Sequence, residues 1–581
     1  MRSCVELRTA VPPPRRNDKT ASPHNTDHEP TNPPTRREPT MTVRADGETL
    51  TPEDVARVAR ENDPVGVPAT AREKVRVARE RVEEVMESGE VVYGLNTGFG
   101  ELVDVRIPDE DVEQLQLNLV RSHAAGAGRE LAREEVRALL LGRLNALVKG
   151  YSGVREVVVD HLVAMLNEGI HPVVKSRGSL GASGDLAPLA HLALVLVGEG
   201  EADVEIDGKD GGTAGEGSER AGSRTERLPG DEALATADLE PLTLRAKEGL
   251  ALINGTQLTV GLAALAVVDA ERAVRAADVA GALTTEVTMG TTASSDDAIA
   301  GVRPHPGHAE SARNVKRLTA DSEIVESHRN CDRVQDAYSI RCLPQVHGAV
   351  RDAIAHLREA VEVELNSATD NPLIFDADEA DDRASGTENA AVLSGGNFHG
   401  DPLALPLDYL TNAVTELAAI CERRVDRMLN PNIQEPHLPP FLTEGSGLRS
   451  GYMIAQYTAA ALLNENRATG RPSMDNTPVS GNQEDHVSMS AQSAFDARAA
   501  VENAITVVGI ELLCGAQAAA FLEDDLAHGV GTAAAYEAVR EVVPPLVEDR
   551  PIHEDIENAD ALVWSGLLEK RVEDALGEPL D

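Results

Sequence analysis

This 581-residue sequence has few cysteines, few aromatic residues and no long apolar run, which excludes several common classes of protein. The five cysteines are an odd number and form no CxxC pair, so a disulfide framework or a cysteine-based zinc cluster is not expected. No run of about 20 uninterrupted apolar residues is available to span a bilayer, and the N-terminus lacks the apolar core of a signal peptide. We therefore expect a soluble protein of the reducing cytoplasm with no membrane partner.

Basic residues are also few relative to acidic residues. The sequence has 54 Lys and Arg residues against 97 Asp and Glu, which gives a formal net charge of −43. Such a chain repels phosphate backbones, so nucleic acid is not an expected partner. The acidic residues recur along the chain, as in segments 73–90 and 129–137, instead of forming one tail. A dispersed acidic surface favours adaptation to high salt, as in a halophile; an ordinary acidic cytosolic protein is the alternative.

Composition divides the chain into parts. Residues 1–40 are rich in Pro, Arg, Thr and Asn and have no hydrophobic period, which predicts a disordered N-terminal extension with Met41 as the biological start. We expect an N-terminal region over 41–240, in which the Gly- and Ser-rich segment 208–232 is a flexible insertion. A helical bundle with a C-terminal helical region is expected over 241–581.

Hydrophobic periodicity predicts a mainly helical protein. Amphipathic spacing or long alanine-rich stretches indicate helices, and small residues on long helices allow close side-by-side packing. The predicted fold class is therefore mainly α, a bundle of long helices. The predicted helices are Ala71–Glu87, Leu131–Val148, Val154–Leu166, Leu250–Ala282, Gln345–Leu365, Leu403–Leu429 and Ser490–Leu522.

Because aromatic residues make up only 2% of the chain, their placement is informative. Tyr93, Phe99, Tyr338 and Phe398 lie in polar segments that contain Gly, Asn or Gln, and not in the apolar helices. Clustered polar side chains need hydrogen-bond partners if they are buried. Eight such segments therefore predict loops that converge on a site at helix ends. They are 93–100, 118–128, 178–191, 253–257, 335–348, 366–372, 395–400 and 481–489.

The segment GSLGASGDLAPLAH (178–191) is the most specific of these. Asp185 is a good helix N-cap, and Pro188 suits the first turn of a helix. A phosphate-binding loop is disfavoured, because no Lys-Ser or Lys-Thr pair follows the glycines. An ordinary turn before a helix would explain Asp185 and Pro188 but not three glycines within seven residues.

Taken together, these motifs resemble the aromatic amino acid lyase family from about Val91 to Met489, and in particular its members that act on histidine. The resemblance implies a fumarase- and aspartase-like helical bundle with a smaller N-terminal loop-and-helix region that carries a prosthetic group. That group, 4-methylideneimidazole-5-one, forms autocatalytically from Ala182, Ser183 and Gly184. The amide nitrogen of Gly184 attacks the carbonyl of Ala182, and Ser183 loses its hydroxyl as water to leave an electrophilic methylidene carbon. No metal or diffusible cofactor is expected.

The resemblance also implies a catalytic role for Tyr93 and a substrate-binding role for Arg341, in addition to catalytic roles for Tyr338 and Glu484. Tyr93 corresponds to the base that removes the β-proton, for which the phenol pKa must fall well below its usual value near 10. Arg341 corresponds to a clamp for the substrate carboxylate, because its planar fork matches two oxygens. The alternatives are a core tyrosine and a structural salt bridge.

Four more residues are expected to line the site by the same resemblance. Tyr338 and Asn254 would face the substrate amine and the prosthetic group, and Gln335 would hydrogen-bond nearby. Phe398 would pack against the substrate, with simple core packing as its alternative.

Polar side chains at two positions favour histidine as the substrate. An imidazole ring offers a donor and an acceptor, whereas a phenyl ring would leave His123 and Glu484 unpaired at a cost of about 1–3 kcal/mol each. Glu484 could accept a hydrogen bond from the imidazole N–H. The alternative for His123 is a core histidine with satisfied hydrogen bonds. A metal site at 484–486 is disfavoured, because sequence neighbours do not converge on one ion and HExxH spacing is missing.

The implied activity is the non-oxidative elimination of ammonia from L-histidine to give trans-urocanate, the first step of histidine degradation. Whether the electrophile takes the amine or the imidazole ring stays open. The family also implies a homotetramer with active sites shared between subunits. Three alternatives stay open: a lyase or aminomutase acting on phenylalanine or tyrosine, an inactive helical scaffold, and a fumarase-like lyase, which would lack the Ala-Ser-Gly loop.

Overall fold

The structure is a computed structural model and describes residues 42–92, 94–95, 97, 107–206, 224–329, 331, 333–381, 383–474, 476–522 and 526–581. Met41–Asp581 forms one compact unit, and the division expected near residue 240 stays a prediction. The predictions for residues 1–40, Tyr93, Phe99 and most of segment 208–232 lie outside the described residues.

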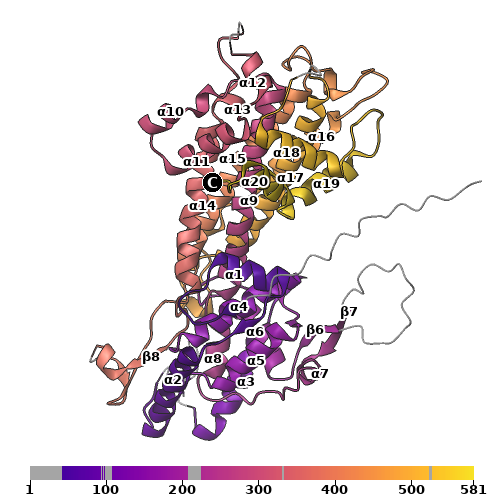
Figure 1. Ribbon diagram of the computed structural model, residues 1–581. Coiled ribbons are helices and arrows are strands. Elements are labelled where there is room, and N and C mark those ends of the chain that lie inside the picture. Colours follow the sequence, from indigo (N-terminus) through magenta and orange to yellow (C-terminus); the bar gives the residue numbers. More distant parts are fainter. Residues whose placement is uncertain are drawn as a thin grey trace, which may run out of the picture. The chain divides into compact units, whose positions relative to one another are not determined.

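Helices dominate the described residues, and their order along the chain is visible in Figure 1. The first eight are α1 (Pro52–Ala56), α2 (Ala69–Ser88), α3 (Val112–His123), α4 (Arg133–Val148), α5 (Glu156–Asn167), α6 (Leu186–Leu196), α7 (Gly230–Ala235) and α8 (Glu248–Ile253). The next six are α9 (Gln257–Val287), α10 (Asp297–Val302), α11 (Pro306–Leu318), α12 (Glu323–Ser327), α13 (Tyr338–Arg341) and α14 (Leu343–Leu365). The last six are α15 (Asp401–Leu429), α16 (Met453–Ala468), α17 (Ser490–Ala519), α18 (Val530–Val542), α19 (Ile552–Trp564) and α20 (Leu567–Leu576).

The strands are short and form small sheets at the edges of the helical structure. Two sheets have two strands each: β1 and β2 are parallel, and β3 and β5 are antiparallel. Two further sheets are antiparallel and have three strands each, in the orders β4-β6-β7 and β8-β10-β9. Their bounds are β1 (Val43–Arg44), β2 (Val65–Gly66), β3 (Ala127–Glu130), β4 (Ile170–Pro172), β5 (Lys175–Arg177), β6 (Glu201–Ile206), β7 (Arg224–Pro229), β8 (Leu373–Asp376), β9 (Ser385–Gly386) and β10 (Ala390–Leu393).

Four long helices make the core. α17 packs against α15 and α9, and α14 packs against α15 and α9. Buried alanines line their contacts, as at Ala263 and Ala277 on α9 and Ala504 on α17. Side chains this small let helix axes approach closely, so the predicted long-helix bundle is confirmed.

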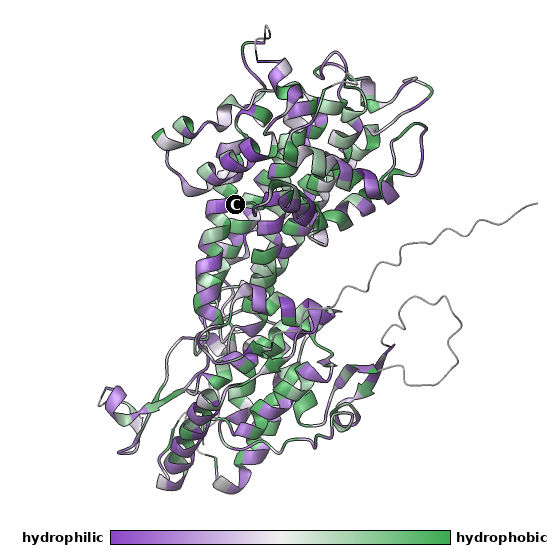
Figure 2. Ribbon diagram, in the orientation of Figure 1, coloured by the Kyte–Doolittle hydropathy of each residue, from purple (hydrophilic) through white to green (hydrophobic). Residues whose placement is uncertain are grey.

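α17 is long and apolar enough to cross a membrane by length and composition, although the sequence analysis identified no span. Its buried residues are consecutive from Val507 to Ala518, so every side of that half of the helix is covered; Figure 2 shows green, hydrophobic residues throughout the helices of the protein. In its most apolar window 78% of residues are buried inside the protein, and α15, α9, α16 and α19 all pack against it. A helix that is apolar all round and surrounded by protein is a core helix.

The helix predicted over Leu250–Ala282 is wrong in one respect: it is two helices. α8 ends at Ile253 and α9 begins at Gln257. Between them Gly255 has φ +139°, a conformation closed to other residues, and it pairs as a β-bridge with Gly184. The interruption places Asn254 outside either helix.

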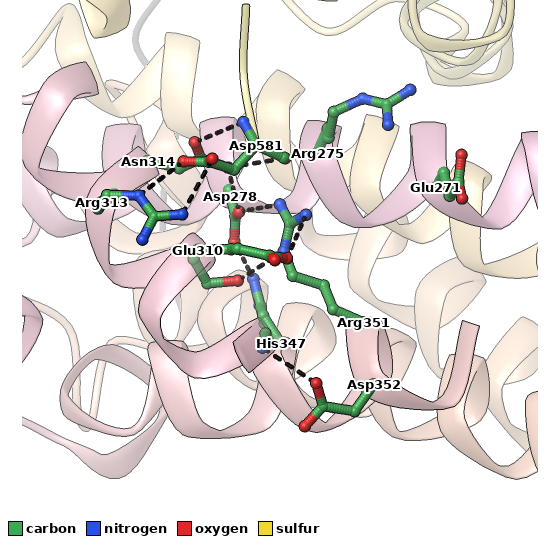
Figure 3. Close-up of polar contacts among 12 residues, drawn as sticks. Glu271, Arg275, Asp278, Glu310, Arg313, Asn314, His347, Arg351, Asp352 and Asp581 are labelled. Carbon is green, nitrogen blue, oxygen red and sulfur yellow. Dashed lines mark hydrogen bonds and ion pairs between the residues drawn. The ribbon is translucent and has the colours of Figure 1, made fainter. Parts of the chain in front are cut away.

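A buried charged cluster joins the long helices. Asp278 of α9 accepts hydrogen bonds from His347 Nδ1 (2.7 Å), Arg351 Nη2 (2.6 Å) and Asn314 Nδ2 (2.9 Å), as Figure 3 shows. Burial raises the pKa of Asp278, but Arg351 and the hydrogen bond from His347 outweigh it and hold that pKa well below its usual value. Asp278 is therefore an ionised carboxylate with its oxygens satisfied.

The cluster continues toward α13. Arg424 of α15 pairs with Glu511 of α17 at 2.5 Å, and both side chains are fully buried. Arg424 also lies 3.3 Å from His347 Nε2 and donates to the backbone carbonyl of Ser339 in α13 at 3.4 Å. Charged groups inside the bundle thus support the short helix that carries Tyr338 and Arg341.

Candidate functional site

The Ala182-Ser183-Gly184 segment is a tight turn packed against a second glycine. Gly184 has φ +72°, and a Cβ placed there would lie 2.2 Å from the carbonyl oxygen of Gly255. The next amide, that of Asp185, donates to the same carbonyl at 2.7 Å. A side chain at position 184 is therefore excluded both by backbone conformation and by space.

The N-termini of four helices meet around this turn. α6 begins directly after it, and α9 begins just beyond Gly255. Gly400, which precedes α15, donates to the carbonyl of Gly181 at 2.9 Å, and Met489, which precedes α17, donates to the carbonyl of Leu180 at 2.8 Å. Each helix N-terminus carries partial positive charge. The turn therefore lies in a field that favours negative charge developing on it.

Asp185 occupies the predicted N-cap position, but its side chain does not cap α6. Its carboxylate instead accepts from the Thr259 backbone N–H (2.9 Å), the Thr259 hydroxyl (3.1 Å) and the Ser179 hydroxyl (2.7 Å). Burial raises the pKa of this carboxyl, against the opposing effect of these donors. Asp185 therefore joins the turn to α9, a long-range role that a local sequence pattern does not reveal.

Asn254 holds the carbonyl of Ser183. In the amide orientation that satisfies both ends, Nδ2 donates to Ser183 O at 3.1 Å and Oδ1 accepts from the Asn371 backbone N–H at 2.9 Å. The side chain is buried, with 4% of its surface exposed. A buried amide paired at both ends has a fixed direction, so the Ser183 carbonyl has a preset donor.

A buried ion pair supports this amide. Lys247 Nζ lies 2.5 Å from Asp370 Oδ2, and neither side chain reaches solvent. The other oxygen of Asp370 accepts from the Asn371 N–H at 2.6 Å, the same group that Asn254 contacts. Burial lowers the pKa of Lys247, and the charge of Asp370 opposes that effect. The pair thereby fixes the backbone against which Asn254 is oriented.

Arg143 of α4 closes the end of α8. Its Nη1 donates to Ala251 O and its Nη2 to Asn254 O, each at 2.7 Å. Carbonyls at a helix C-terminus are unpaired acceptors, and a cation there is favourable. Burial lowers the pKa of Arg143 to about 10, which leaves the guanidinium charged near neutrality.

The turn opens on a cavity of about 690 Å³. The Ser183 hydroxyl donates to Glu484 Oε1 at 3.1 Å, so one predicted site residue contacts another across 301 positions of sequence. Phe398 also lines this cavity. The complete set of lining residues is Ala182, Ser183, Asn371, Ser394, Gly395, Phe398, His399, Asp401, Gln483, Glu484, Asp485 and His486.

Gln335, Tyr338 and Arg341 lie elsewhere, around a second cavity of about 540 Å³. The Arg341 guanidinium stacks on the Tyr338 ring at 4.7 Å, and Tyr338 is 71% exposed. Among the described residues no carboxylate is paired with Arg341, so the salt-bridge alternative has no support within one subunit. Figure 1 places α13 well apart from α6. One chain therefore does not bring these three residues to Ser183.

His123 is the last residue of α3, and its Nδ1 lies 2.8 Å from the Leu119 carbonyl. It is not among the residues that line the Ser183 cavity in the described part of the chain. Its ring is partly exposed, and its Nδ1 is bonded within its own helix. Tyr93 lies outside the described residues.

Sequence reasoning missed Lys247, Asp370, Asn371 and Arg143. Asp370 and Asn371 belong to a polar segment that the sequence analysis singled out (366–372), which is the signal that could have found them. Arg143 lies in ordinary helical sequence and Lys247 directly precedes α8, and both act through partners more than 100 residues away, so neither gave a local signal.

The geometry fits a group built from the turn itself. Ring closure needs a side-chain-free residue at 184 and a held carbonyl at 183, and both are present. It also needs a serine hydroxyl next to a group that can exchange a proton with it, and Glu484 occupies that place. A cluster of helix N-termini around such a group would draw electrons toward it.

Comparisons with known proteins agree with this geometry. Residues 50–541 match the family model described as aromatic amino acid lyase. A probable histidine ammonia-lyase of Halobacterium salinarum is 63% identical over 93% of this chain and 99% of its own length. A histidine ammonia-lyase of Natranaerobius thermophilus is 44% identical over 92% of this chain and 99% of its own.

Solved structures are similar as well. A tyrosine aminomutase from Streptomyces globisporus has a TM-score of 0.83 at 37% identity and covers 93% of this chain and 100% of its own. A histidine ammonia-lyase from Trypanosoma cruzi has a TM-score of 0.81 at 38% identity, over 92% of this chain and 96% of its own. The chain belongs to the aromatic amino acid lyase family.

Proposed function

We propose that this protein is a histidine ammonia-lyase that converts L-histidine to trans-urocanate and ammonia. The observation that carries the proposal is the Ala182-Ser183-Gly184 turn, with the Ser183 hydroxyl 3.1 Å from Glu484 at the wall of a cavity. The 63% identity to a probable histidine ammonia-lyase over nearly the whole chain supports the choice of substrate.

The prosthetic group proposed for this site is 4-methylideneimidazole-5-one formed from Ala182, Ser183 and Gly184. Once formed, it supplies an electrophilic carbon that makes the amine of the substrate a better leaving group. Asn254 holds the Ser183 carbonyl by a hydrogen bond of 3.1 Å, and the four helix N-termini stabilise negative charge on the turn. No metal is needed for these roles.

The remaining residues bind and orient the substrate. Glu484 would accept the imidazole N–H, and Phe398 would offer an apolar face in the same cavity, which both residues line. Arg341 would bind the substrate carboxylate through two parallel hydrogen bonds, with Tyr338 and Gln335 beside it. Tyr93 would remove the β-proton, and His123 would contact the substrate as well.

The separation of these groups supports a shared site in a homotetramer. Ser183 and Arg341 line different cavities of one chain, while Arg341 has no carboxylate partner among the described residues and an exposed aromatic neighbour. An arginine from a second subunit would supply the positive charge that the Ser183 cavity lacks for a carboxylate. We expect light scattering in molar KCl to give a mass of four chains.

The charge of −43 supports a salt-adapted protein working in the cytoplasm. At high ionic strength the Debye length falls to about 3 Å, so repulsion between surface carboxylates is largely screened. Assays therefore belong in molar KCl.

The decisive assay incubates the purified protein with L-histidine, L-tyrosine and L-phenylalanine and follows the ultraviolet absorbance of each unsaturated product. We expect product from L-histidine alone and a fall to near background in Ser183→Ala. Ser183→Thr keeps a hydroxyl at this position and is the matched control for Ser183→Ala. Equal turnover of tyrosine would favour the related lyase or aminomutase, and full activity of Ser183→Ala would refute the proposal.

A further inference from the structure

A histidine–aspartate–histidine cluster lies at the wall of the Ser183 cavity, outside the roles assigned above. It consists of His399 before α15, Asp401 in the first turn of α15, and His486 in the loop before α17. One ligand atom from each of the three lies within 4.8 Å of the other two. Neighbours 484–486 alone were not expected to bind a metal, whereas His399, Asp401 and His486 come together across 87 positions of sequence.

We propose that His399, Asp401 and His486 form a binding site for a divalent cation of the zinc class. Asp401 Oδ2 lies 3.5 Å from His399 Nδ1 and 3.3 Å from His486 Nε2. Ligands bound tetrahedrally at 2.0–2.1 Å are separated by about 3.3 Å. Two of the three edges of such a site are therefore already set. The two histidine nitrogens must approach each other, and because their rings are stacked nearly parallel, one ring must also rotate to direct its lone pair at the ion.

The protonation of His399 suits ligation. Its Nε2 lies 3.2 Å from the backbone carbonyl of His486, and because a carbonyl only accepts, Nε2 must carry the proton. The lone pair of a neutral ring is then on Nδ1, which faces Asp401 Oδ2. The Asp401 backbone N–H also points to Nδ1, at a long 3.4 Å. Metal-binding histidines characteristically donate their second N–H to a carbonyl in this way.

The two rings are held parallel. Their centroids are 5.6 Å apart and their planes differ by 8°. A neutral His399 ring with its proton on Nε2 would present the Nδ1 lone pair to a carboxylate oxygen, and a cation between these two acceptors would bind both. Histidine nitrogen and carboxylate oxygen are both ligands that zinc accepts.

The charge around the cluster also favours a cation. Glu484 and Asp485 line the same cavity, and the described residues that line it include no Lys or Arg. Two imidazoles and one carboxylate leave a fourth tetrahedral position open. Because all three side chains line the cavity, that position is accessible from the space beside Ser183.

Cobalt(II) titration tests the site, since tetrahedral Co²⁺ absorbs visible light and substitutes for zinc. The full chain, stripped with a chelator and free of amino acids, is titrated in molar KCl while absorbance is recorded. We expect intense bands that saturate at one Co²⁺ per chain and are displaced by Zn²⁺. His399→Ala and His486→Ala should each weaken binding about tenfold or more.

His305→Ala is the matched control, because His305 also lies near a carboxylate, 4.0 Å from Asp352, but has no second histidine. It should bind Co²⁺ as the unaltered chain does. Ser183→Ala should bind Co²⁺ normally too, which separates this test from that of the proposed function. His486 is 68% exposed, so its replacement should not impair folding. Absence of saturable bands, or unchanged binding in both histidine variants, would overturn the site.

Discussion

At the scale of single residues, the space occupied by Gly184 decides whether the turn can close. The carbonyl of Gly255 fills the place where a side chain would begin. The sequence predicts this turn well, because alanine, serine and glycine in that order are demanded by local chemistry. It predicts the partner Gly255 less well, since that contact depends on the fold.

Gly184→Ala should abolish both ring formation and activity. The added methyl would lie 2.2 Å from Gly255 O in a backbone conformation of φ +72° that alanine rarely adopts. Mass spectrometry of the peptide around residue 183 should show the unaltered chain lighter by the water released in ring closure and by the second water released in dehydration of Ser183, and the variant without these losses. Gly89→Ala, with φ +74° but open space, controls for backbone strain alone. A dehydrated peptide in the 184 variant would contradict the steric argument.

Asp370→Asn should destabilise the protein by about 3–5 kcal/mol, because it leaves the buried ammonium of Lys247 without a counter-charge. Chemical denaturation in constant KCl measures the change. The double variant Lys247→Met with Asp370→Asn should lose less stability than the two single changes added together. Strict additivity would mean that the two side chains do not interact in solution.

At the scale of secondary structure, the amphipathic and alanine-rich patterns located the long helices to within a few residues. α15 and α17 begin within two residues of their predicted starts. The break between α8 and α9 was not predicted, although the polar segment 253–257 marks it, because apolar helical sequence continues on both sides of that segment. Tertiary pairing with Gly184 overrides the local preference for one continuous helix.

α14 carries a carboxyl whose titration should affect stability. Burial raises the pKa of Glu364 to about 7, against a hydrogen bond from Thr256. The folded protein then binds this proton more tightly than the unfolded chain, whose carboxyl titrates near 4.5. The neutral Glu364 carboxyl therefore contributes fully to the free energy of unfolding below pH 4.5, the pKa in the unfolded chain. This contribution is lost as the pH rises through about 7, the pKa in the folded protein.

Glu364→Gln should therefore change stability differently on the two sides of this range. Near pH 4 the variant should resemble the unaltered protein, and near pH 8 it should be more stable by about 3 kcal/mol. Urea unfolding at several pH values in constant KCl measures the difference. Glu359→Gln, an exposed position on the same helix, should show no such trend. An equal effect at both pH values would rule out a raised pKa as the cause.

At the scale of the whole molecule, sequence motifs predicted the members of the site but could not say which of them lie together within one chain. Ser183, Glu484 and Phe398 share a cavity, whereas Gln335, Tyr338 and Arg341 line another. A sequence motif identifies a residue that the site needs, but it gives no distance between that residue and the other residues of the site. Hydrophobic periodicity and turn-forming residues predict local structure, and they do not predict how chains assemble.

Complementation tests the proposed sharing. Ser183→Ala and Arg341→Ala should each be nearly inactive alone. If every site takes Ser183 and Arg341 from different chains, randomly mixed assemblies should regain about one quarter of full activity. Co-expression of the two variants, each with its own affinity tag, allows the mixed assemblies to be isolated. The two variants purified separately and combined just before the assay give the baseline activity. Mixed assemblies as inactive as that baseline would place both residues in one chain.

The contacts around the Ala-Ser-Gly turn also set the order of events in biosynthesis. Leu180, Gly181 and Asp185 bond to Met489, Gly400 and Gly255, so the turn is complete only when the segment through α17 has been synthesised and has folded. A ribosome-bound chain that ends before residue 489 lacks the last of these bonds. Under the proposed function, ring closure is therefore expected after translation and only in chains that have folded through the start of α17.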